Sequence, residues 1–368
     1  MKYEPIFKLP YSNIFITNLL FKGAYGEFNA IATIKNGKWE LFIEKELLNK
    51  LSEERYNEVI KGTNFKEFEK NSLHLAEELK KLDIEIKDLG NKEFLEFLNQ
   101  MFDVGGRFMK NYSKTEFFFF TKIEKKLGEI IKDKFSFEDV LSKKVSIDSW
   151  QENDKRVAEY IISMQHLKFE LRKVLNEVWM GPNSILSRVL EQIVIRTGRE
   201  DALSMTFEEV NDCLNDKKIE DVSSRHVYSY ITWNGNLTII SGGEAYRKIR
   251  ELDKDIPKNE VVGTPACGGI ARGKVKVIPL SMNPTEYLSK MEKGDVLVSD
   301  TTGPEMMVAI EKAVAIVTDE GGMMSHAAII SREFNIPCVV GTTYATEVFK
   351  DGDLVEVNAN NGIVKKIE

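Results

Sequence analysis

The chain has 368 residues, 42% of them hydrophobic and 30% charged, and this composition argues against a disordered chain. Lysine and arginine total 51 against 58 aspartates and glutamates, so the net charge of -7 argues against a general nucleic-acid binder. Met1–Pro5 carries an acidic residue and no long apolar run, so we expect neither a secretory signal nor a membrane span. We therefore expect a cytoplasmic protein of about two or three domains that binds neither nucleic acid nor membrane.

The cysteines are few. Cys213, Cys267 and Cys338 are the three in the chain, and none lies at metal-ligand spacing. An odd, sparse set of thiols is typical of a reducing compartment, which agrees with a cytoplasmic location. We expect all three to be small apolar packing residues, and the sequence predicts no metal site.

Residues 1–252 are mostly helical by pattern, with two short hairpins. Each hairpin is predicted by an Asn-Gly pair between two apolar runs, because Asn-Gly favours the left-handed turn of two-residue loops. The pairs are Asn36-Gly37, between Ala30–Ile34 and Trp39–Ile43, and Asn234-Gly235, between Val227–Thr232 and Leu237–Ile240. A last helix is predicted over Glu244–Leu252.

The clearest helix of this half is predicted to begin near Ser149, where Ser149-Trp150-Gln151-Glu152 fits a capping box. Its apolar positions recur every three or four residues and so form one face of a helix. They are Val157, Ile161, Met164, Leu167, Leu171, Val174 and Val178. Gly181-Pro182 predicts the end of this helix.

Three features of the helical half admit both a binding and a structural interpretation, and we favour the structural one. The four aromatics Phe117–Phe120 more often fill a helical core than a ligand pocket. Lys168, Arg172 and Lys173 are more typical of a solvated helix face than of an anion site. The histidines of this half, His74, His166 and His226, have no partner residues at useful spacing.

The polar stretch 253–260 lacks periodicity and predicts an interdomain linker. From Val261 onward, short apolar runs alternate with glycine-rich turns, and two short helices are interleaved. The predicted strands are Lys274–Ile278, Val296–Ser299, Val314–Thr318, Cys338–Val340 and Leu354–Val357. The first short helix opens at Thr302-Gly303-Pro304-Glu305, with proline at its first position.

The second short helix carries the candidate chemistry. Gly321-Gly322 predicts a loop whose backbone can approach a ligand closely, and Ser325 is a good N-cap. In the helix that follows, Ala327, Ile330 and Phe334 fall on one face, which we expect to pack on the sheet. His326 then falls in the first helical turn, where backbone N–H groups and the helix dipole favour a phosphoryl dianion. A neutral imidazole is a nucleophile near neutral pH, and the hydroxyls of Thr318 and Ser325 could orient it or bind phosphoryl oxygens. Taken alone, a single histidine at a helix start is more often structural.

Several further motifs occur in a fixed order around His326. They are Gly269-Ile270-Ala271-Arg272-Gly273-Lys274-Val275, Gly294–Val298, Thr302–Glu305, Ala315–Thr318, Gly321–Ile329, Ser331–Glu333 and Ile336–Thr342. This ordered set resembles the mobile, swivelling domain of the phosphoenolpyruvate-utilising enzymes. That family includes pyruvate, water dikinase, pyruvate phosphate dikinase and rifampin phosphotransferase. A weaker resemblance to such chains covers Thr206–Val210 and Arg225–Leu252.

The resemblance implies a β/β/α swivelling phosphohistidine domain over 261–368. Together with the mostly α-helical domain over 1–252 and the linker over 253–260 that the patterns predict, this gives an α+β chain. It implies that His326 is phosphorylated and that Thr318, Gly321, Gly322 and Ser325 surround it. In large family members the corresponding histidine moves between an ATP-grasp nucleotide site and a second site for an acceptor such as pyruvate.

Residues 1–252 show no recognisable phosphate-binding glycine loop, barrel pattern or carboxylate cluster typical of magnesium binding. We therefore expect a phosphotransferase component that needs a separate ATP-grasp chain as partner. That partner would phosphorylate His326 from ATP or phosphoenolpyruvate, and the group would pass to a small-molecule acceptor. We expect no cofactor on this chain, and any Mg²⁺ would accompany the nucleotide on the partner.

The sequence departs from the family pattern at two places. Cys267-Gly268-Gly269 stands where the family commonly has Ser-Pro-Gly, and Met323 stands where it often has arginine or a small polar residue. Methionine cannot donate a hydrogen bond to a phosphate. Two alternatives therefore stay open, namely a non-catalytic regulatory or binding protein that retains the swivelling fold, and a self-contained enzyme with an acceptor pocket in the helical half.

Overall fold

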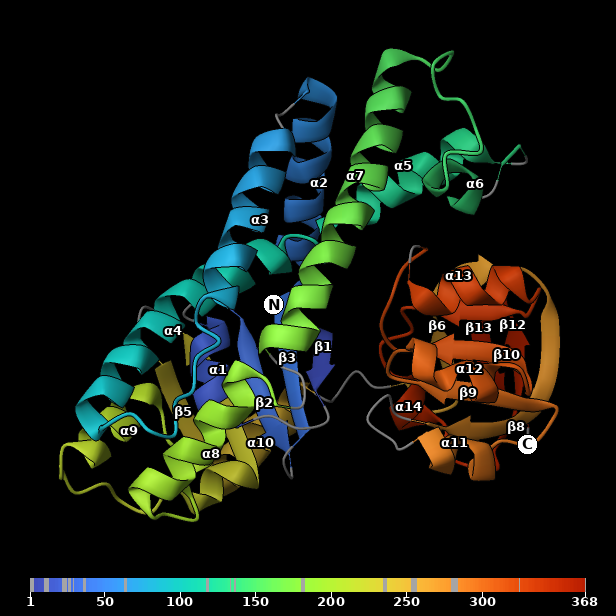
Figure 1. Cartoon of the computed structure of the whole chain (residues 1–368). Helices are drawn as coiled ribbons and strands as arrows, with labels where there is room; N and C mark the ends of the chain where they lie inside the picture. The colour runs from blue at the N-terminus through green and yellow to red at the C-terminus, as the bar shows by residue number, and fades with distance from the viewer. Residues whose placement is uncertain are drawn as a thin grey trace. The chain divides into compact units, whose positions relative to one another are not determined.

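The computed structural model describes residues 3–9, 13–21, 25, 28, 30–35, 38–62, 65–116, 119–132, 134–135, 137–179, 183–233, 237–252, 257–278, 284–323 and 325–367. The chain divides into two compact units (Figure 1). One consists of Met1–Tyr3, Tyr11–Ile123 and Ile147–Glu251, and the other of Glu4–Pro10, Glu124–Ser146 and Leu252–Glu368. The domain boundaries drawn from the sequence stay a prediction, and residues 253–256 of the expected linker lie outside the described residues.

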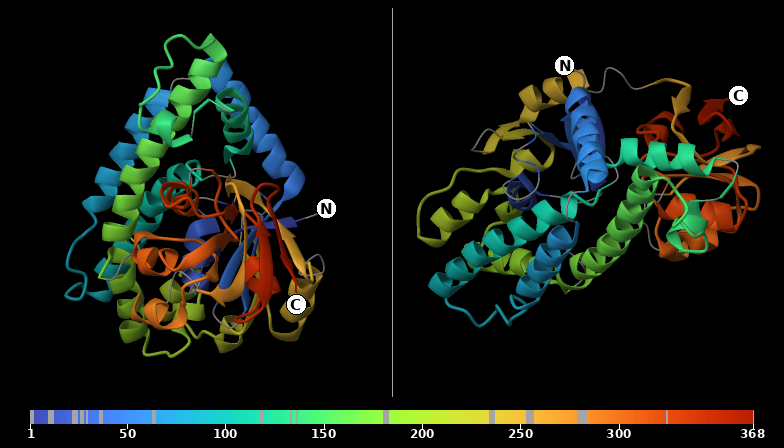
Figure 2. Two further views of the ribbon diagram at one scale, coloured as in Figure 1. Left: turned by 90° about the vertical axis from the view of Figure 1, so that its right-hand side faces the viewer. Right: turned by 90° about the horizontal axis from the view of Figure 1, so that it is seen from above.

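The chain before residue 253 is mostly helical. Its described helices are α1 (Ile14–Leu20), α2 (Lys45–Lys61), α3 (Phe65–Lys80), α4 (Asn91–Ser113), α5 (Thr121–Ile131), α6 (Phe137–Leu141), α7 (Glu152–Val174), α8 (Ile185–Thr197), α9 (Phe207–Leu214) and α10 (Gly242–Leu252). A π-helical turn, Leu175–Trp179, continues α7, and α3 packs against both α4 and α7 (Figure 2). Among the described residues, every helix is too short or too polar to span a bilayer.

A five-stranded sheet accompanies these helices. Its strands are β1 (Tyr3–Leu9), β2 (Ile31–Lys35), β3 (Lys38–Glu44), β4 (Tyr228–Trp233) and β5 (Leu237–Ser241), in the order β1-β3-β2-β4-β5. Both predicted hairpins are confirmed, because β2 pairs antiparallel with β3 and β4 pairs antiparallel with β5. Their turn residues, 36–37 and 234–236, lie outside the described residues.

The start of α7 differs from its prediction. The helix begins at Glu152, and its N-cap is Gln151, whose side chain makes no capping hydrogen bond. The capping box predicted at Ser149 is wrong, because the Trp150 N–H bonds to the Ile147 carbonyl and residues 147–150 form a separate turn. The apolar face of α7 is confirmed as buried from Val157 to Val174, and its predicted stop, residues 181–182, lies outside the described residues.

The structural interpretation of the other N-terminal features holds where the structure describes them. Phe119 and Phe120 are buried, whereas residues 117–118 lie outside the described residues. The Lys168 ammonium pairs with the Glu116 carboxylate at 3.0 Å. The exposed residues of this set are Arg172, Lys173, His74, His166 and His226.

The strands after residue 257 form an eight-stranded sheet. They are β6 (Glu260–Val262), β7 (Thr264–Cys267), β8 (Ile270–Val277), β9 (Asp295–Ser299), β10 (Ala313–Thr318), β11 (Cys338–Val340), β12 (Leu354–Asn358) and β13 (Ile363–Lys366), in the order β6-β13-β12-β8-β9-β10-β11-β7. Neighbours from β8 to β11 run parallel, and the outer pairings are antiparallel. The five predicted strands are confirmed. The sequence did not predict β6, β7 and β13, which have three or four residues each and offer little periodicity.

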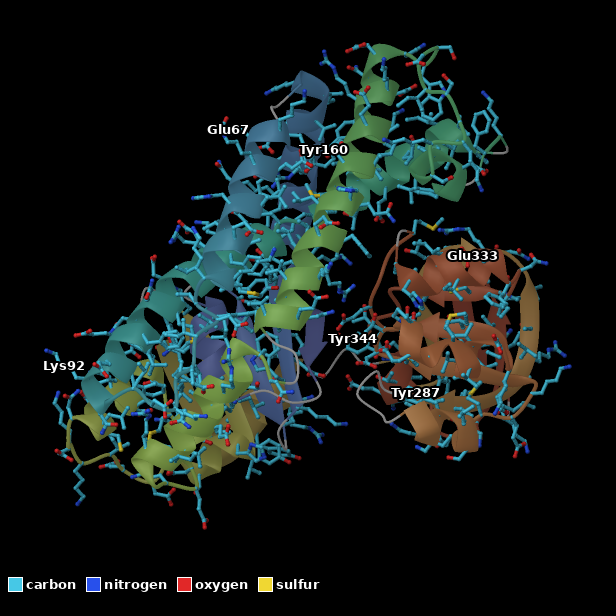
Figure 3. The ribbon with its side chains drawn as sticks, viewed as in Figure 1. Glu67, Lys92, Tyr160, Tyr287, Glu333 and Tyr344 are labelled. Carbon is cyan, nitrogen blue, oxygen red and sulfur yellow. The ribbon has the colours of Figure 1, made fainter. Side chains whose placement is uncertain are left out.

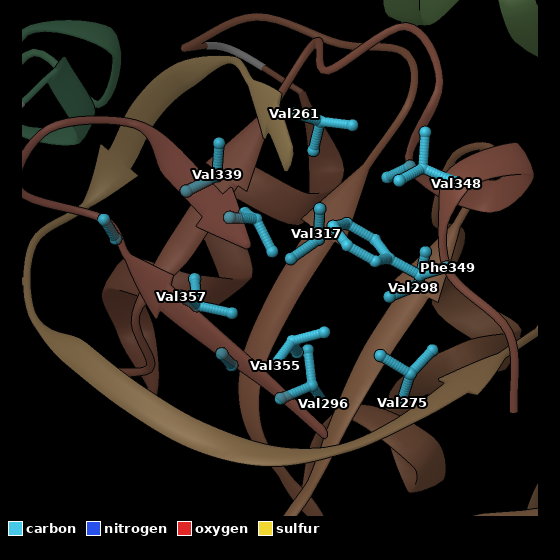
Figure 4. Packing of buried hydrophobic residues seen from close by; sticks show 14 residues of the cluster. Val261, Val275, Val296, Val298, Val317, Val339, Val348, Phe349, Val355 and Val357 are labelled. Atoms are coloured by element: carbon cyan, nitrogen blue, oxygen red, sulfur yellow. The ribbon is translucent and has the colours of Figure 1, made fainter. Parts of the chain in front are cut away.

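This sheet has a hydrophobic core on each face, because successive side chains of a strand point to opposite sides. On β9, Val296 and Val298 enter a core of valines with Phe349 (Figure 4), whereas Leu297 enters the other core. The helices around the sheet are α11 (Pro284–Lys290), α12 (Met307–Ile310), α13 (His326–Glu333) and α14 (Ala345–Val348). Parallel strands are normally covered on both faces, and the whole chain is α+β as expected.

Candidate functional site

Three loops meet where the parallel strands β9, β10 and β11 end. Backbone hydrogen bonds continue past the strands, from the Asp319 N–H to the Ser299 carbonyl at 3.0 Å and from the Thr342 N–H to the Thr318 carbonyl at 3.0 Å. The carboxyl ends of parallel strands are the usual place for ligands in open α/β sheets. This edge of the sheet is therefore the candidate site.

The buried Asp319 carboxylate holds two of these loops together. It accepts hydrogen bonds from the Thr342 hydroxyl at 3.3 Å, from the Thr346 N–H at 3.2 Å and from the Thr346 hydroxyl. Asp319 is 4% exposed, so these donors replace the water that its charge would otherwise need. The loop after β10 is thereby fixed against the loop after β11.

The glycine loop shapes the start of α13. Gly321 has a φ of +113°, and a Cβ there would lie 2.9 Å from the Ser325 Cβ, so only glycine fits this turn. The carbonyl of the buried Gly322 accepts a hydrogen bond from the Ser325 N–H at 3.0 Å. The Ser325 hydroxyl accepts the Ala328 N–H at 3.3 Å, which confirms Ser325 as the N-cap. His326 is therefore the first residue of α13, as the sequence predicts.

The His326 ring is half-buried and has a defined partner. Its Nδ1 lies 3.0 Å from the Thr302 hydroxyl, and Thr302 is 7% exposed in the loop after β9. This bond fixes the orientation of the imidazole. Where Nδ1 carries the proton and the hydroxyl accepts it, the lone pair lies on Nε2, which is then the nucleophilic atom.

Thr302 is the site residue that sequence reasoning missed, although it belongs to the Thr302–Glu305 motif. The sequence predicted that the Thr318 hydroxyl would support the site. The Thr318 side chain is fully buried, and its hydroxyl donates a hydrogen bond to the Glu320 carbonyl at 2.6 Å. Thr318 thus shapes the turn before the glycine loop, whereas Thr302 contacts the ring.

Arg332 and Met323 link the loop to its surroundings. Arg332 reaches back from the last turn of α13 and donates to the Met323 carbonyl at 2.9 Å and to the Ala266 carbonyl at 3.3 Å. The Met323 side chain packs against the apolar core beneath α13. It therefore occupies a packing position in the loop.

The buried face of α13 is confirmed in part. Ala327 is buried and Ile330 packs against the core, but Phe334 is 44% exposed. The prediction for Phe334 is wrong because the helix ends at Glu333, labelled in Figure 3, so residue 334 no longer follows the helix face.

Comparison with known proteins bears on this part of the chain. Residues 291–362 match the family described as PEP-utilising enzyme, mobile domain. This stretch is therefore similar to the mobile domain of the phosphoenolpyruvate-utilising enzymes. The phosphoenolpyruvate synthase of Aeropyrum pernix is 49% identical over 114 residues, which are 30% of this chain and 14% of that protein.

A second relative extends further along the chain. The rifampicin phosphotransferase of Streptomyces sviceus is 32% identical over 218 residues, which are 57% of this chain and 24% of that protein. This alignment is longer than the predicted domain 261–368. The chain thus spans a quarter or less of the length of either relative.

Likeness to solved structures is weak. The crystal structure of Thermococcus kodakaraensis aconitase X gives a TM-score of 0.24 at 23% identity, over 30% of this chain and 98% of that one. A solution structure of Enzyme I gives a TM-score of 0.22 at 13% identity, over 100% of this chain and 89% of that one. Neither value supports an argument about fold or function.

Proposed function

We propose that this chain is a phosphotransferase component that carries a phosphoryl group on His326. The observation that carries the proposal is the 3.0 Å contact between the Thr302 hydroxyl and His326 Nδ1 at the first residue of α13. One contact orients the ring, and the helix start supplies a favourable field for an anion. The match of residues 291–362 to the mobile-domain family supports the same function.

The transfer has two steps. In the first, the Nε2 lone pair attacks the donor phosphorus, the N–P bond forms, and the P–O bond breaks with its electrons passing to the leaving oxygen. In the second, a deprotonated acceptor oxygen attacks the same phosphorus, the new P–O bond forms, and the N–P bond electrons return to Nε2. In this proposal Nδ1 keeps its proton and donates a hydrogen bond to Thr302 throughout. The ring recovers its neutral form when the N–P bond electrons return to Nε2, and one difficult transfer becomes two easier ones.

The donor site belongs to a separate ATP-grasp chain in this proposal. The relatives are more than twice as long as this chain, which leaves room for such a site in them. Mg²⁺ would accompany the nucleotide there, and this chain would hold no cofactor. The acceptor would be a small molecule such as pyruvate, in keeping with the name of the phosphoenolpyruvate synthases.

The test is phosphorylation of the full chain. It is incubated with radiolabelled phosphoenolpyruvate, or with labelled ATP and candidate ATP-grasp proteins. We expect acid-labile, alkali-stable label that His326→Ala abolishes and that the exposed-site control His166→Ala retains. Label that survives His326→Ala would overturn the proposal.

Absence of label with every donor would favour a second function, a regulatory or binding protein that retains the swivelling fold. One observation favours it, namely that the Met323 side chain beside the site packs into the core and has no hydrogen-bond donor to offer a phosphate.

A further inference from the structure

Two of the three cysteines, far apart in sequence, lie opposite each other on neighbouring strands of the sheet. Cys267 on β7 and Cys338 on β11 are direct partners in the antiparallel register. Both side chains belong to the apolar core beneath α13, so they point to the same face. The register of the two strands shifts next to this pair, between Cys338 and Val339. In a regular antiparallel ladder, opposite residues have Cα atoms about 4.5–5.5 Å apart, within the span of about 4.4–6.8 Å that a disulfide bridges.

The pair is connected to the His326 loop by two contacts. The Cys338 thiol donates to the Ala327 carbonyl, with an Sγ–O distance of 3.8 Å, and Ala327 directly follows His326. The residue before Cys267, Ala266, accepts a hydrogen bond from Arg332, which also binds the Met323 carbonyl in the loop. A change at either sulfur therefore acts on the first turn of α13 or on the loop before it.

The two thiols differ in access. Cys338 is fully buried, and burial raises the pKa of its thiol to about 12. Cys267 is half-buried, and burial raises its pKa while the Arg332 guanidinium opposes that shift. An oxidant from solvent reaches Cys267 first, and because both thiols are largely protonated at neutral pH, the reaction is slow.

We propose that Cys267 and Cys338 close a cross-strand disulfide when a peroxide oxidises Cys267, and that this bridge slows phosphorylation of His326. The second half of the proposal rests on the proposed function. The Cys267 sulfur attacks the peroxide, the O–O bond breaks, and a sulfenic acid and one water form. The Cys338 sulfur then attacks the sulfenic sulfur, the S–O bond breaks, and a second water leaves. In total, two thiols and one hydrogen peroxide give one disulfide and two waters.

The bridge changes the support beneath α13. Bonded sulfurs lie about 2.05 Å apart, so Cys338 must turn toward Cys267 and can no longer donate to the Ala327 carbonyl. The first turn of α13 loses that contact, and the His326 ring loses part of its fixed position. Misplacement of a reacting group lowers transfer rates, so we expect phosphorylation to slow about tenfold.

The test uses the full chain, oxidised with hydrogen peroxide and digested with trypsin without reduction. The three cysteines fall in separate fragments, residues 200–217, 259–272 and 333–350. We expect fragments 259–272 and 333–350 to appear joined, lighter than their sum by two hydrogen atoms and separable by a thiol reductant. The link should persist in Cys213→Ser and disappear in Cys267→Ser, a half-buried position that tolerates serine better than Cys338 does.

Separate oxidation of the two thiols without a link, or links only between molecules, would overturn the bridge. A complete link with an unchanged phosphorylation rate would overturn its effect on His326. Because the link is measured without any phosphoryl donor, a chain that links but accepts no label when reduced contradicts the proposed function and leaves the bridge established.

Discussion

The N-termini of α9 and α13 differ in charge, because acidic residues lie in the first turn of α9 and none lies in the first turn of α13. At the start of α9, the Thr206 hydroxyl accepts a hydrogen bond from the Glu209 N–H at 3.1 Å. The Glu209 carboxylate accepts one from the Thr206 N–H at 2.8 Å. Arg225 binds the same carboxylate through both of its terminal nitrogens. At α13, Ser325 is the cap, and the first turn holds no acidic residue.

The difference bears on which of these two helix starts can accept a phosphoryl group. The α9 start already carries its own anion, because Glu208 and Glu209 lie in its first turn. The α13 start offers the same dipole and backbone donors, and its first turn holds an imidazole instead of a carboxylate. A helix start that the chain itself neutralises stabilises the fold, whereas one without an acid can bind a ligand. Substitutions at the two starts should therefore affect different measurements.

The largest effect on the α13 start is expected from Gly321→Ala. The new Cβ would lie 2.9 Å from the Ser325 Cβ, and alanine would have to adopt a φ of +113°. The N-cap of α13 must therefore move. We expect a loss of about 2–4 kcal/mol in the free energy of unfolding, together with loss of His326 labelling. The stability is measured by urea denaturation.

Gly352→Ala is the matched control for this substitution. Gly352 also has a positive φ, +90°, but its Cβ would meet nothing within 4 Å. Backbone strain alone should cost about 1 kcal/mol and leave labelling intact. Equal losses in both variants would show that the Ser325 contact is unimportant.

Thr302→Val is expected to have the next largest effect, and on transfer rather than on stability. Valine has nearly the same shape but cannot form a hydrogen bond with Nδ1, so the ring loses the partner that orients it. We expect phosphorylation of His326 to slow about 10- to 100-fold, and Thr302→Ser to restore most of the rate. Nitrogen NMR of the imidazole should show mixed tautomers in the valine variant. An unchanged tautomer ratio would remove Thr302 from the site.

The contrast between His326 and Thr302 also shows what the sequence could predict. Gly321, Ser325 and His326 lie within six residues, so glycine, cap and helix signals place them without tertiary information. Thr302 meets the ring only because β9 pairs parallel with β10 in a register that sets Ser299 beside Thr318. That register depends on the whole sheet, and the same holds for the cysteine pair on β7 and β11. Local order was therefore predictable, whereas contacts between strand ends were not.

The smallest effect is expected at the α9 start, from Arg225→Gln. Arg225 Nη1 and Nη2 lie 2.6 Å and 3.0 Å from the two Glu209 carboxylate oxygens, but both side chains are partly exposed, so we expect a loss of about 1 kcal/mol. Burial alone would raise the pKa of Glu209, but hydrogen bonds from Arg225 and from the Thr206 N–H outweigh it and hold the pKa below its usual value.

A lowered folded-state pKa stabilises the fold above the unfolded-state pKa, about 4.3, and this contribution disappears as the pH falls through the folded-state value. The difference between wild type and Arg225→Gln should therefore be full at neutral pH and vanish in acid, as measured by urea denaturation across that range. Arg272→Gln, which removes a more exposed partner of Glu356, should change stability less. A loss that persists at low pH would assign the role of Arg225 to packing, and any loss of His326 labelling would contradict the separation of the two helix starts.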